Sequence, residues 1–485
     1  MVVPKKRSNF RGGKRSSNQQ AMKGKQAVPT QQRGEGDLHT KLERIEKRSR
    51  ADRDAMFNNL GHLINLEMLR RCFHSLDGSK AVGADGMTKE KYERNLEPNL
   101  ERLLAGIRRG SYHPQPARLV EIAKSDGTMR PLAISCFEDK IVQEATRSVL
   151  ERIYEPIFLD CSHGFRPKRS CQTALVALDA QLKWQASGAV LEIDLQKCFN
   201  TIPHAPLIEW LRLKIADNRF LHLIIKQLKA PILNAEGKPE RSEIGSPQGS
   251  ILSPLLANVY LHYVIDTWFT WVNGAYFDGA ANLVRYADDG VFTFKSMAAA
   301  ERFLSSLRKR LEKYGIRLHE GKTKVIVSGS REAALRNMRG EQMPSFTFLG
   351  FTHYWGKAWN RKLRLEFWRV KRRTCSIRFR KKLLAIKEFI RANRQKKDLM
   401  TRVLRILRGY LNYFAVNDNS KRVSQFNNEV RRMLFKYLNR RSQRCSMDWQ
   451  EFRNIVKKIG YPENVKLRNL FFISNTSGTK PGGCW

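Results

Sequence analysis

The sequence predicts an α+β fold in which antiparallel hairpins precede an all-helical basic region. Two stretches have the hairpin pattern: residues 117–134 alternate around a Ser-Asp-Gly turn, and residues 282–294 place apolar runs around Ala-Asp-Asp-Gly. In the last third of the chain, apolar residues between 404 and 414 recur at spacings of three and four, which predicts helix. Residues 351–485 carry 34 Lys and Arg against 8 Asp and Glu, so the helical region is strongly basic.

Composition argues against a secreted or membrane-spanning protein and indicates a polyanionic partner. The 485 residues include 89 Lys and Arg against 46 Asp and Glu, a net charge of +43, and 41% are hydrophobic. A folded chain with this excess is expected to bind nucleic acid or an acidic membrane surface. Apolar runs stay below the ~20 residues of a spanning helix, and the basic N-terminus lacks the apolar core of a secretory signal. The eight scattered cysteines form no Cys-x-x-Cys pair, as expected of reduced intracellular thiols.

The N-terminal part of the chain is expected to be helical behind a disordered basic arm. Residues 1–36 are rich in basic and small polar residues, and this arm is either a solvated tail or a weak RNA contact. Leucine spacing predicts helix between residues 38 and 71, and a glycine-punctuated loop at 80–87 precedes a charged helix. After the first hairpin, residues 139–153 have an amphipathic helical pattern and a basic loop follows at 162–170.

The middle of the chain places carboxylates at the ends of predicted strands. Asp288 and Asp289 lie at the turn of the second hairpin, where Gly290 is expected to supply a positive φ. Asp194 ends another apolar β-type run, and Phe199 follows it five residues later. The simplest interpretation is that Asp288 and Asp289 are solvated turn residues and that Asp194 caps the end of a strand. The alternative is a two-metal site, which needs a third carboxylate from elsewhere in the fold, and Asp194 supplies it.

A loop and three basic helices complete the prediction. Residues 243–258 form a Gly/Pro/Ser loop that opens into an apolar helix, and backbone N–H groups at such a helix start favour phosphate. Helices are expected near residues 376–392, 399–415 and 422–439. A solvated charged face is the usual reason for basic helices, but solubility alone does not require so few acidic residues.

In this order the segments resemble the reverse transcriptases encoded by group II introns, over roughly residues 55–455. The motifs are Gly83-Ala-Asp-Gly86, Lys124…Arg130-Pro-Leu, Ser162-His-Gly-Phe-Arg-Pro167, Asp194…Phe199, Ser246-Pro-Gln-Gly249, Tyr286-Ala-Asp-Asp289, Leu318-His-Glu-Gly-Lys-Thr-Lys324, Phe348-Leu-Gly-Phe351, Arg408-Gly-Tyr-Leu-Asn-Tyr413 and Asn439-Arg-Arg-Ser-Gln-Arg444. The sequence departs from the family at Asn200, where an Asp usually follows the Phe, and this puts local geometry or fidelity in question.

The resemblance implies a right-hand polymerase, with fingers and palm built on antiparallel sheet, followed by an all-α basic thumb or maturase domain. The expected parts are a disordered arm (1–36), an N-terminal extension with fingers (37–188), a palm with the catalytic carboxylates (189–352), a helical thumb or maturase domain (353–440) and a short basic nucleic-acid-binding region (441–485). An HNH endonuclease domain is not expected, because the paired cysteines of that domain are missing.

The resemblance also implies an RNA-directed DNA polymerase, a nucleotidyltransferase in which the three aspartates hold two Mg²⁺ ions. Lys124 and Arg130 would lie against the incoming triphosphate, Gln248 would contact the nucleotide, and Phe199 would lie under its sugar. Lys322 is a candidate proton donor to the pyrophosphate. The residues expected to bind RNA are Arg372, Arg373, Arg378, Arg380, Arg408, Arg440 and Arg441.

The implied partners are a group II intron RNA, an RNA template with a DNA primer, a DNA target and deoxynucleoside triphosphates, with no membrane. As a maturase the protein would assist splicing by stabilising folded intron RNA, and it would support retrohoming by target-primed reverse transcription. The alternative is a domesticated enzyme that acts in DNA repair or phage defence without an intron partner. The expected location is the bacterial cytoplasm, with an organelle left open.

Overall fold

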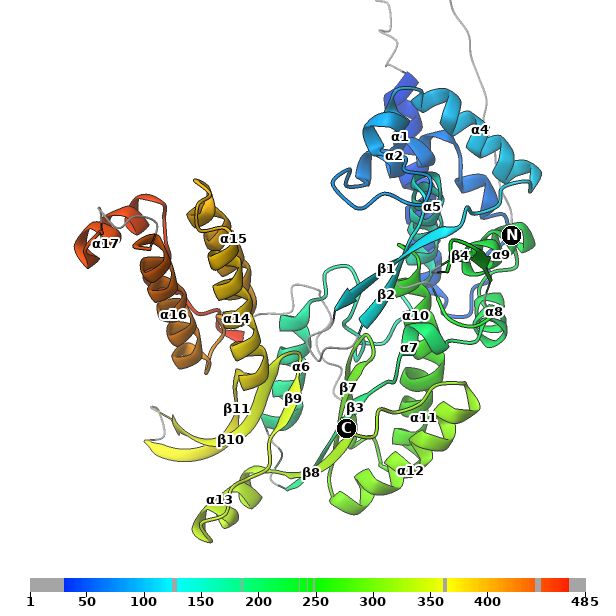
Figure 1. Ribbon diagram of the computed structural model, residues 1–485. Coiled ribbons are helices and arrows are strands. Elements are labelled where there is room, and N and C mark those ends of the chain that lie inside the picture. The colour runs from blue at the N-terminus through cyan, green and yellow to red at the C-terminus, as the bar shows by residue number, and fades with distance from the viewer. Residues whose placement is uncertain are drawn as a thin grey trace, which may run out of the picture.

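The computed structural model describes residues 30–123, 129–183, 185, 187–234, 236–241, 243–246, 249–360, 364–440 and 446–470. Figure 1 shows a helical region with a small sheet at the top, a central sheet flanked by helices, and long C-terminal helices at the left. Most of the predicted basic arm lies outside the described residues. Its last part does not fit the prediction of disorder, because helix α1 already begins at Thr30.

Helices of the N-terminal region pack their apolar faces into one core. They are α1 (Thr30–Ala51), a 3-10 turn (Gly61–Leu63), α2 (Leu66–Ser75), α3 (Lys89–Glu93), α4 (Leu96–Arg109) and α5 (Phe137–Tyr154). The helix predicted between residues 38 and 71 is thus interrupted. The carboxylate of Asp217 holds the interruption, because it accepts hydrogen bonds from the N–H groups of Leu60 and Gly61 at 2.7 and 2.8 Å.

The paired strands of the first predicted hairpin are confirmed and belong to a small four-stranded sheet of order β2-β1-β4-β5, while the predicted Ser-Asp-Gly turn lies outside the described residues. The strands of this sheet are β1 (Ala117–Ala123), β2 (Met129–Ile134), β4 (Ile232–Leu233) and β5 (Pro239–Glu240). The β1–β2 pair is antiparallel and sets Ile122 opposite Arg130. Helices α8 (His204–Arg212) and α9 (Asn218–Leu228) precede β4 and bury their apolar faces in the N-terminal core.

A central antiparallel sheet has the order β6-β7-β3-β8 and is buried on both faces. Its strands are β3 (Gly188–Asp194), β6 (Asn282–Tyr286), β7 (Asp289–Phe294) and β8 (Lys324–Ser328). Side chains alternate along β3, so Leu191 and Ile193 join the N-terminal core and Val190 joins a second core on the opposite face. The surrounding helices are α6 (Cys171–Lys183), α7 (Cys198–Thr201), α10 (Ser253–Leu261), a π-helix (His262–Asp266), α11 (Thr267–Tyr276) and α12 (Met297–Lys313).

The C-terminal region begins with a β-hairpin, and this corrects the expectation that residues 353–440 are all helical. Strands β9 (Phe346–Phe348), β10 (Phe351–Asn360) and β11 (Leu365–Thr374) form a three-stranded sheet after α13 (Ser330–Met338). The three predicted helices are confirmed as α14 (Ser376–Ala392), α15 (Leu399–Phe414) and α16 (Ser420–Leu438), and α17 (Trp449–Lys458) follows. Tyr410 and Phe426 stack at 3.5 Å between ring centroids, which joins α15 to α16 inside the second core.

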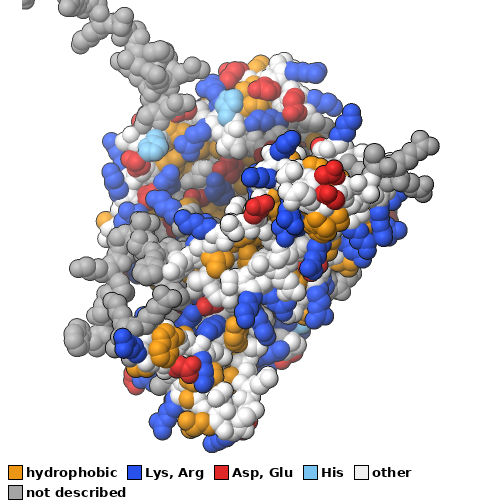
Figure 2. All heavy atoms as spheres, turned by 90° about the vertical axis from the view of Figure 1, so that its left-hand side faces the viewer, with side chains coloured by type: hydrophobic (Ala, Val, Ile, Leu, Met, Phe, Trp, Pro, Cys, Tyr) orange, Lys and Arg blue, Asp and Glu red, His pale blue; other side chains and the backbone are white. Residues whose placement is uncertain are grey.

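Within the described part of the chain, no helix combines the length and the apolar character needed to cross a bilayer. Figure 2 looks onto the face that carries the C-terminal helices and shows Lys and Arg side chains spread widely across it.

Candidate active site

The central sheet brings the three predicted carboxylates to one edge. Strands β6 and β7 pair Tyr286 with Asp289, so Ala287 and Asp288 form a two-residue turn. Strand β3 pairs with β7 on its other side and sets Asp194 directly opposite Asp289. Because β3 ends at Asp194 and β7 begins at Asp289, the carboxylates from two distant segments meet where the turn projects. The predicted hairpin is confirmed.

Gly290 does not supply the positive φ that the sequence led us to expect. Positive φ occurs at Ala287, at 58°, and Gly290 lies in the extended strand β7. A Cβ at Gly290 would lie 2.9 Å from Cγ1 of Ile193 on the neighbouring strand. Glycine is therefore required for the close packing of β7 on β3, and not for the turn.

The carboxylates are close enough to affect one another's protonation. Burial, followed by the charges of Asp288 and Asp194, raises the pKa of Asp289 to about 7. Burial also raises the pKa of Asp288, and Asp194 raises it further, while Arg130 and Lys322 act in the opposite direction. Like charges held together in this way are stabilised by a cation.

A lysine supplies part of that positive charge. The Nζ atom of Lys322 lies 2.5 Å from Oδ2 of Asp194, in the loop just before β8. Across the described residues, no three His, Cys, Asp or Glu side chains converge closely enough to hold a metal ion. The donor set itself fits a hard divalent cation, since it consists of carboxylate oxygens, and a bound cation would offset the burial and mutual repulsion that raise the pKa of Asp288 and Asp289.

Two arginines from distant segments of the chain act on these carboxylates. Arg130 lies on β2 of the small sheet and lowers the pKa of Asp288. Arg378 lies in the first turn of α14 and lowers the pKa of Asp289. Arg130 was expected beside the incoming triphosphate, and this role stays a prediction. Arg378 was expected only as an RNA contact, and its proximity to Asp289 could not be read from the sequence.

Phe199 lies half-buried in α7, immediately beyond β3. Its backbone is fixed by the next motif, because the N–H of Ser246 donates to the Phe199 carbonyl at 2.7 Å. A Cβ at Gly245 would lie 2.9 Å from the carbonyl oxygen of Asn200, so the loop approaches the backbone of Asn200, whose side chain is exposed. Two predicted nucleotide contacts, Lys124 and Gln248, lie outside the described residues.

Sequence reasoning gave no role to Phe165, which belongs to this site. Its ring lies edge to face with Phe199 at 6.2 Å, it is 53% exposed, and its φ is 55°. A large exposed aromatic side chain on an unfavourable backbone conformation is typical of functional sites. The position of Phe165 in the Ser-His-Gly-Phe-Arg-Pro loop was the available signal, but only the fold shows which residue it faces.

The predicted RNA-binding arginines divide into one buried and several exposed side chains. Arg372 is fully buried and forms an ion pair with Asp179 of α6, so the assignment of Arg372 to RNA is wrong. Arg373 points the other way along β11, is exposed, and lies over the ring of Tyr354 at 5.2 Å. The other exposed members are Arg378, Arg380, Arg408 and Arg440, while Arg441 lies outside the described residues.

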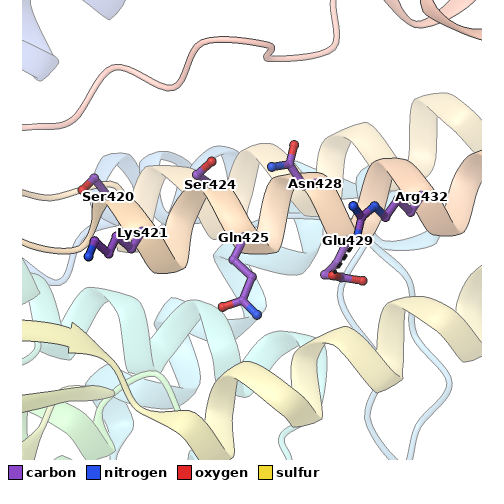
Figure 3. Close-up of a pocket in the computed structure, with 7 residues that line it drawn as sticks. All are labelled: Ser420, Lys421, Ser424, Gln425, Asn428, Glu429 and Arg432. Carbon is purple, nitrogen blue, oxygen red and sulfur yellow. Dashed lines mark ion pairs between the residues drawn. The ribbon is translucent and has the colours of Figure 1, made fainter.

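A hollow with a volume of about 550 Å³ lies along α16 (Figure 3). Four of its lining residues, Ser420, Ser424, Asn428 and Arg432, follow one another at intervals of four along a single face of the helix. The others are Lys421, Gln425 and Glu429. This face presents hydrogen-bonding and basic groups, and it belongs to the C-terminal region and not to the carboxylate edge.

Comparison with known proteins agrees with this site. The family model described as "Reverse transcriptase (RNA-dependent DNA polymerase)" matches residues 122–353, which include all three aspartates. "Group II intron-encoded protein LtrA" of Lactococcus lactis subsp. cremoris is 40% identical over 226 residues, 46% of this chain and 37% of LtrA. "Putative COX1/OXI3 intron 1 protein" of Saccharomyces cerevisiae is 34% identical over 214 residues, 44% of this chain and 25% of that protein.

A bacterial relative is matched along most of its length. "Protein YkfC" of Escherichia coli (strain K12) is 34% identical over 305 residues, which make up 55% of this chain and 80% of YkfC. By contrast, the chain covers well under half of the intron-encoded proteins that it matches, 37% of LtrA and 25% of the yeast protein.

Proposed function

The chain belongs to the reverse transcriptase family, on the branch of group II intron-encoded proteins, and from this membership we propose that it is an RNA-directed DNA polymerase that also acts as a maturase. The observation that carries the polymerase proposal is the strand register that sets Asp194 opposite Asp289, beside Asp288 in the turn. Carboxylates grouped in this way serve phosphoryl transfer when divalent cations neutralise them.

Asp194, Asp288 and Asp289 would hold two Mg²⁺ ions, which supply charge neutralisation and activation of the primer 3′-hydroxyl when bound. Oxygen donors suit Mg²⁺, and a bound cation would offset the burial and the charges of Asp288 and Asp194 that raise the pKa of Asp289. Lys322 neutralises Asp194 in the structure. From its position beside this carboxylate, Lys322 would also meet the pyrophosphate.

The other residues proposed for this site would position the reactants. Arg130 of β2 and Arg378 of α14 both act on the carboxylates electrostatically, so each lies where it can meet phosphate charge. We assign Arg130 to the triphosphate and Arg378 to the backbone of the primer or template. Phe199 would lie under the sugar of the incoming nucleotide and exclude a 2′-hydroxyl, with the ring of Phe165 packed against its edge.

The proposed right-hand arrangement follows the order of the regions. The fingers would comprise residues 37–188, the palm 189–352 and the thumb or maturase domain 353–440, followed by a basic nucleic-acid-binding region at 441–485. The thumb includes the β10–β11 hairpin in addition to α14, α15 and α16. Arg378, at the start of α14, would make the thumb part of the catalytic edge as well as of the RNA surface.

The proposed maturase function rests on the basic C-terminal region. Its exposed arginines and the polar face of α16 would contact phosphates and sugars of structured intron RNA, which is recognised largely by shape (Figures 2 and 3). An RNA template with a DNA primer, deoxynucleoside triphosphates and a DNA target would be the other partners, as retrohoming by target-primed reverse transcription requires. The intron-encoded relatives favour this assignment over a role in DNA repair or phage defence.

Replacement of the turn carboxylates tests the polymerase proposal. Asp288→Asn with Asp289→Asn removes two charges and leaves the C-terminal region unchanged, so primer extension on an RNA template should fall to background while RNA binding is retained. Asp278→Asn is the matched control, because Asp278 is exposed in the loop before β6 and its φ of 50° suits asparagine. Normal extension by the double variant would mean that the hairpin is only a turn.

A further inference from the structure

The turn that carries two of the carboxylates has a conformation that its own residues do not favour. Ala287 is the first residue of this two-residue turn and has a φ of 58°. Hairpin turns usually place Gly, Asn or Asp where φ is positive, because a Cβ is crowded there. Ala287 is only 7% exposed and its side chain has no polar group to stabilise the turn. Contacts from outside the turn therefore have to hold it.

The guanidinium of Arg285 supplies such a contact. Nη1 donates to the Ala287 carbonyl at 3.0 Å and to Oδ1 of Asn258 at 3.1 Å. Nε and Nη2 donate to the two carboxylate oxygens of Asp266 at 2.7 and 2.5 Å, and Nη2 also donates to Oγ of Ser162 at 2.9 Å. These five contacts match the five N–H groups of a guanidinium, and Arg285 is 1% exposed. Its position is fully determined by its partners.

A wider helical turn brings two of those partners together. Asn258 lies in α10 and Asp266 ends the π-helix that follows, eight residues later. Eight residues of regular α-helix would place the second side chain about 80° around the axis from the first. One residue inserted by a π-turn reduces this offset to about 20°. The π-helix therefore allows both side chains to reach one guanidinium.

The loop with the Ser-His-Gly sequence closes the other side of the turn. Ser162 and Arg285 form a parallel bridge, in which the Arg285 N–H donates to the Cys161 carbonyl at 2.7 Å. A Cβ at Gly164 would lie only 2.4 Å from the backbone nitrogen of Ala287. The carbonyl of Gly164 in turn accepts from Nδ2 of Asn258 at 2.7 Å. Three segments that are far apart in the sequence thus converge on the carboxylate turn.

We propose that Arg285 is a positioning residue for nucleotidyl transfer, and that it holds Ala287 in the left-handed conformation from which Asp288 and Asp289 project. This inference rests on the proposed polymerase function and deepens it. Arg285 does not touch the reacting atoms, because each of its five guanidinium N–H groups donates a hydrogen bond to another group of the protein. It acts on the carboxylates through the backbone of one strained residue, and Asp266, Asn258 and Ser162 orient it.

The test separates conformational control from simple packing. Replacing both charges, Asp266→Leu with Arg285→Met, leaves no unpaired buried charge but removes the donor to Ala287. We expect kcat for primer extension to fall at least tenfold, with less than a threefold change in the KM for the nucleotide. Amide hydrogen exchange in residues 286–289 should be at least tenfold faster, a readout that does not depend on polymerase activity.

Glycine at the strained position provides the decisive comparison. Adding Ala287→Gly to the neutral pair should recover at least threefold in kcat, because glycine adopts positive φ without help from Arg285. The matched control is Asp179→Leu with Arg372→Met, which removes a different buried Arg–Asp pair and should leave turn exchange and kcat within threefold of wild type. If the neutral pair fails to fold, Arg285→Lys with and without Ala287→Gly serves for the same comparison.

Three outcomes would overturn the proposal: a folded neutral pair with wild-type kcat, unchanged exchange in the turn, or a loss that Ala287→Gly does not reduce. Wild-type kcat in the neutral pair would mean that Arg285 only forms an internal ion pair. A loss of kcat that Ala287→Gly does not reduce would mean that the substitutions act by disturbing the packing. If wild-type protein itself showed no primer extension, the polymerase proposal would fail, but the exchange measurements would still decide whether Arg285 holds the turn.

Discussion

Arg372 and Arg373 are adjacent on β11, yet their replacement should have opposite consequences. Arg372 is fully buried and forms an ion pair with Asp179, whereas Arg373 is exposed over the ring of Tyr354. Successive residues of a strand point to opposite faces, which accounts for the difference. We expect Arg372→Met to destabilise the protein without changing its RNA contacts. Arg373→Met should instead remove an RNA contact and leave stability nearly unchanged.

The magnitude follows from the surroundings of Arg372. Burial raises the pKa of Asp179 even though Arg372 lies beside it, so desolvation of this pair outweighs its attraction. His353, directly opposite Arg372 in the β-sheet, cannot share the charge, because burial lowers its pKa to about 3 and keeps the imidazole neutral. Removing Arg372 alone leaves a buried unpaired carboxylate and should cost about 3–5 kcal/mol of unfolding free energy.

Urea unfolding followed by circular dichroism measures this loss, and a salt titration of RNA binding measures the contacts. Arg373→Met should change stability by less than about 0.5 kcal/mol and lower the slope of log Kd against log salt by close to one. Asp179→Leu with Arg372→Met should restore stability to within about 1 kcal/mol of wild type or raise it. Equal stability of the two single variants, or a reduced salt slope for Arg372→Met, would refute the reasoning.

Three further predictions concern the carboxylate edge and the basic surface. Phe199→Val should raise ribonucleotide incorporation about ten- to a hundredfold, measured as the ratio of catalytic efficiencies for a deoxy- and a ribonucleotide; an equal fall in both would make Phe199 a packing residue. The pKa of Asp289, about 7 against an ordinary 3.8, is raised in the folded state, so its stabilising contribution is complete below pH 3.8 and is lost as the pH rises through 7. Unfolding of metal-free protein between pH 4.5 and 8 should therefore show Asp289→Asn gaining about 3 kcal/mol relative to wild type, and parallel curves would contradict this. Charge reversal at Arg373, Arg378 and Arg380 should flatten the salt dependence of RNA binding by roughly one unit for each phosphate that is no longer neutralised, and among the three only Arg378 should also reduce primer extension on a bound template.

Local sequence determined much of this protein. The hairpins at 117–134 and 282–294, and the helices that became α14, α15 and α16, depend on turn residues and on apolar periodicity, which act between near neighbours. The hairpin β10–β11 was not predicted from the same local signals. Its alternation of aromatic and basic residues is also compatible with a charged helical surface, and packing against α6, α13 and β9 favours the extended form.

The tertiary structure decided what each functional side chain meets. Asp194 and Asp289 are far apart in the sequence, and only the pairing of β3 with β7 makes them neighbours. Arg285 would be an ordinary strand residue without the π-helix that brings Asp266 to it, and Arg372 would be one more basic residue without Asp179. Such contacts depend on strand register and on long-range packing, because a shift of one residue exchanges the buried and exposed faces. Composition shows that the chain carries many arginines, but burial decides which of them are available to RNA.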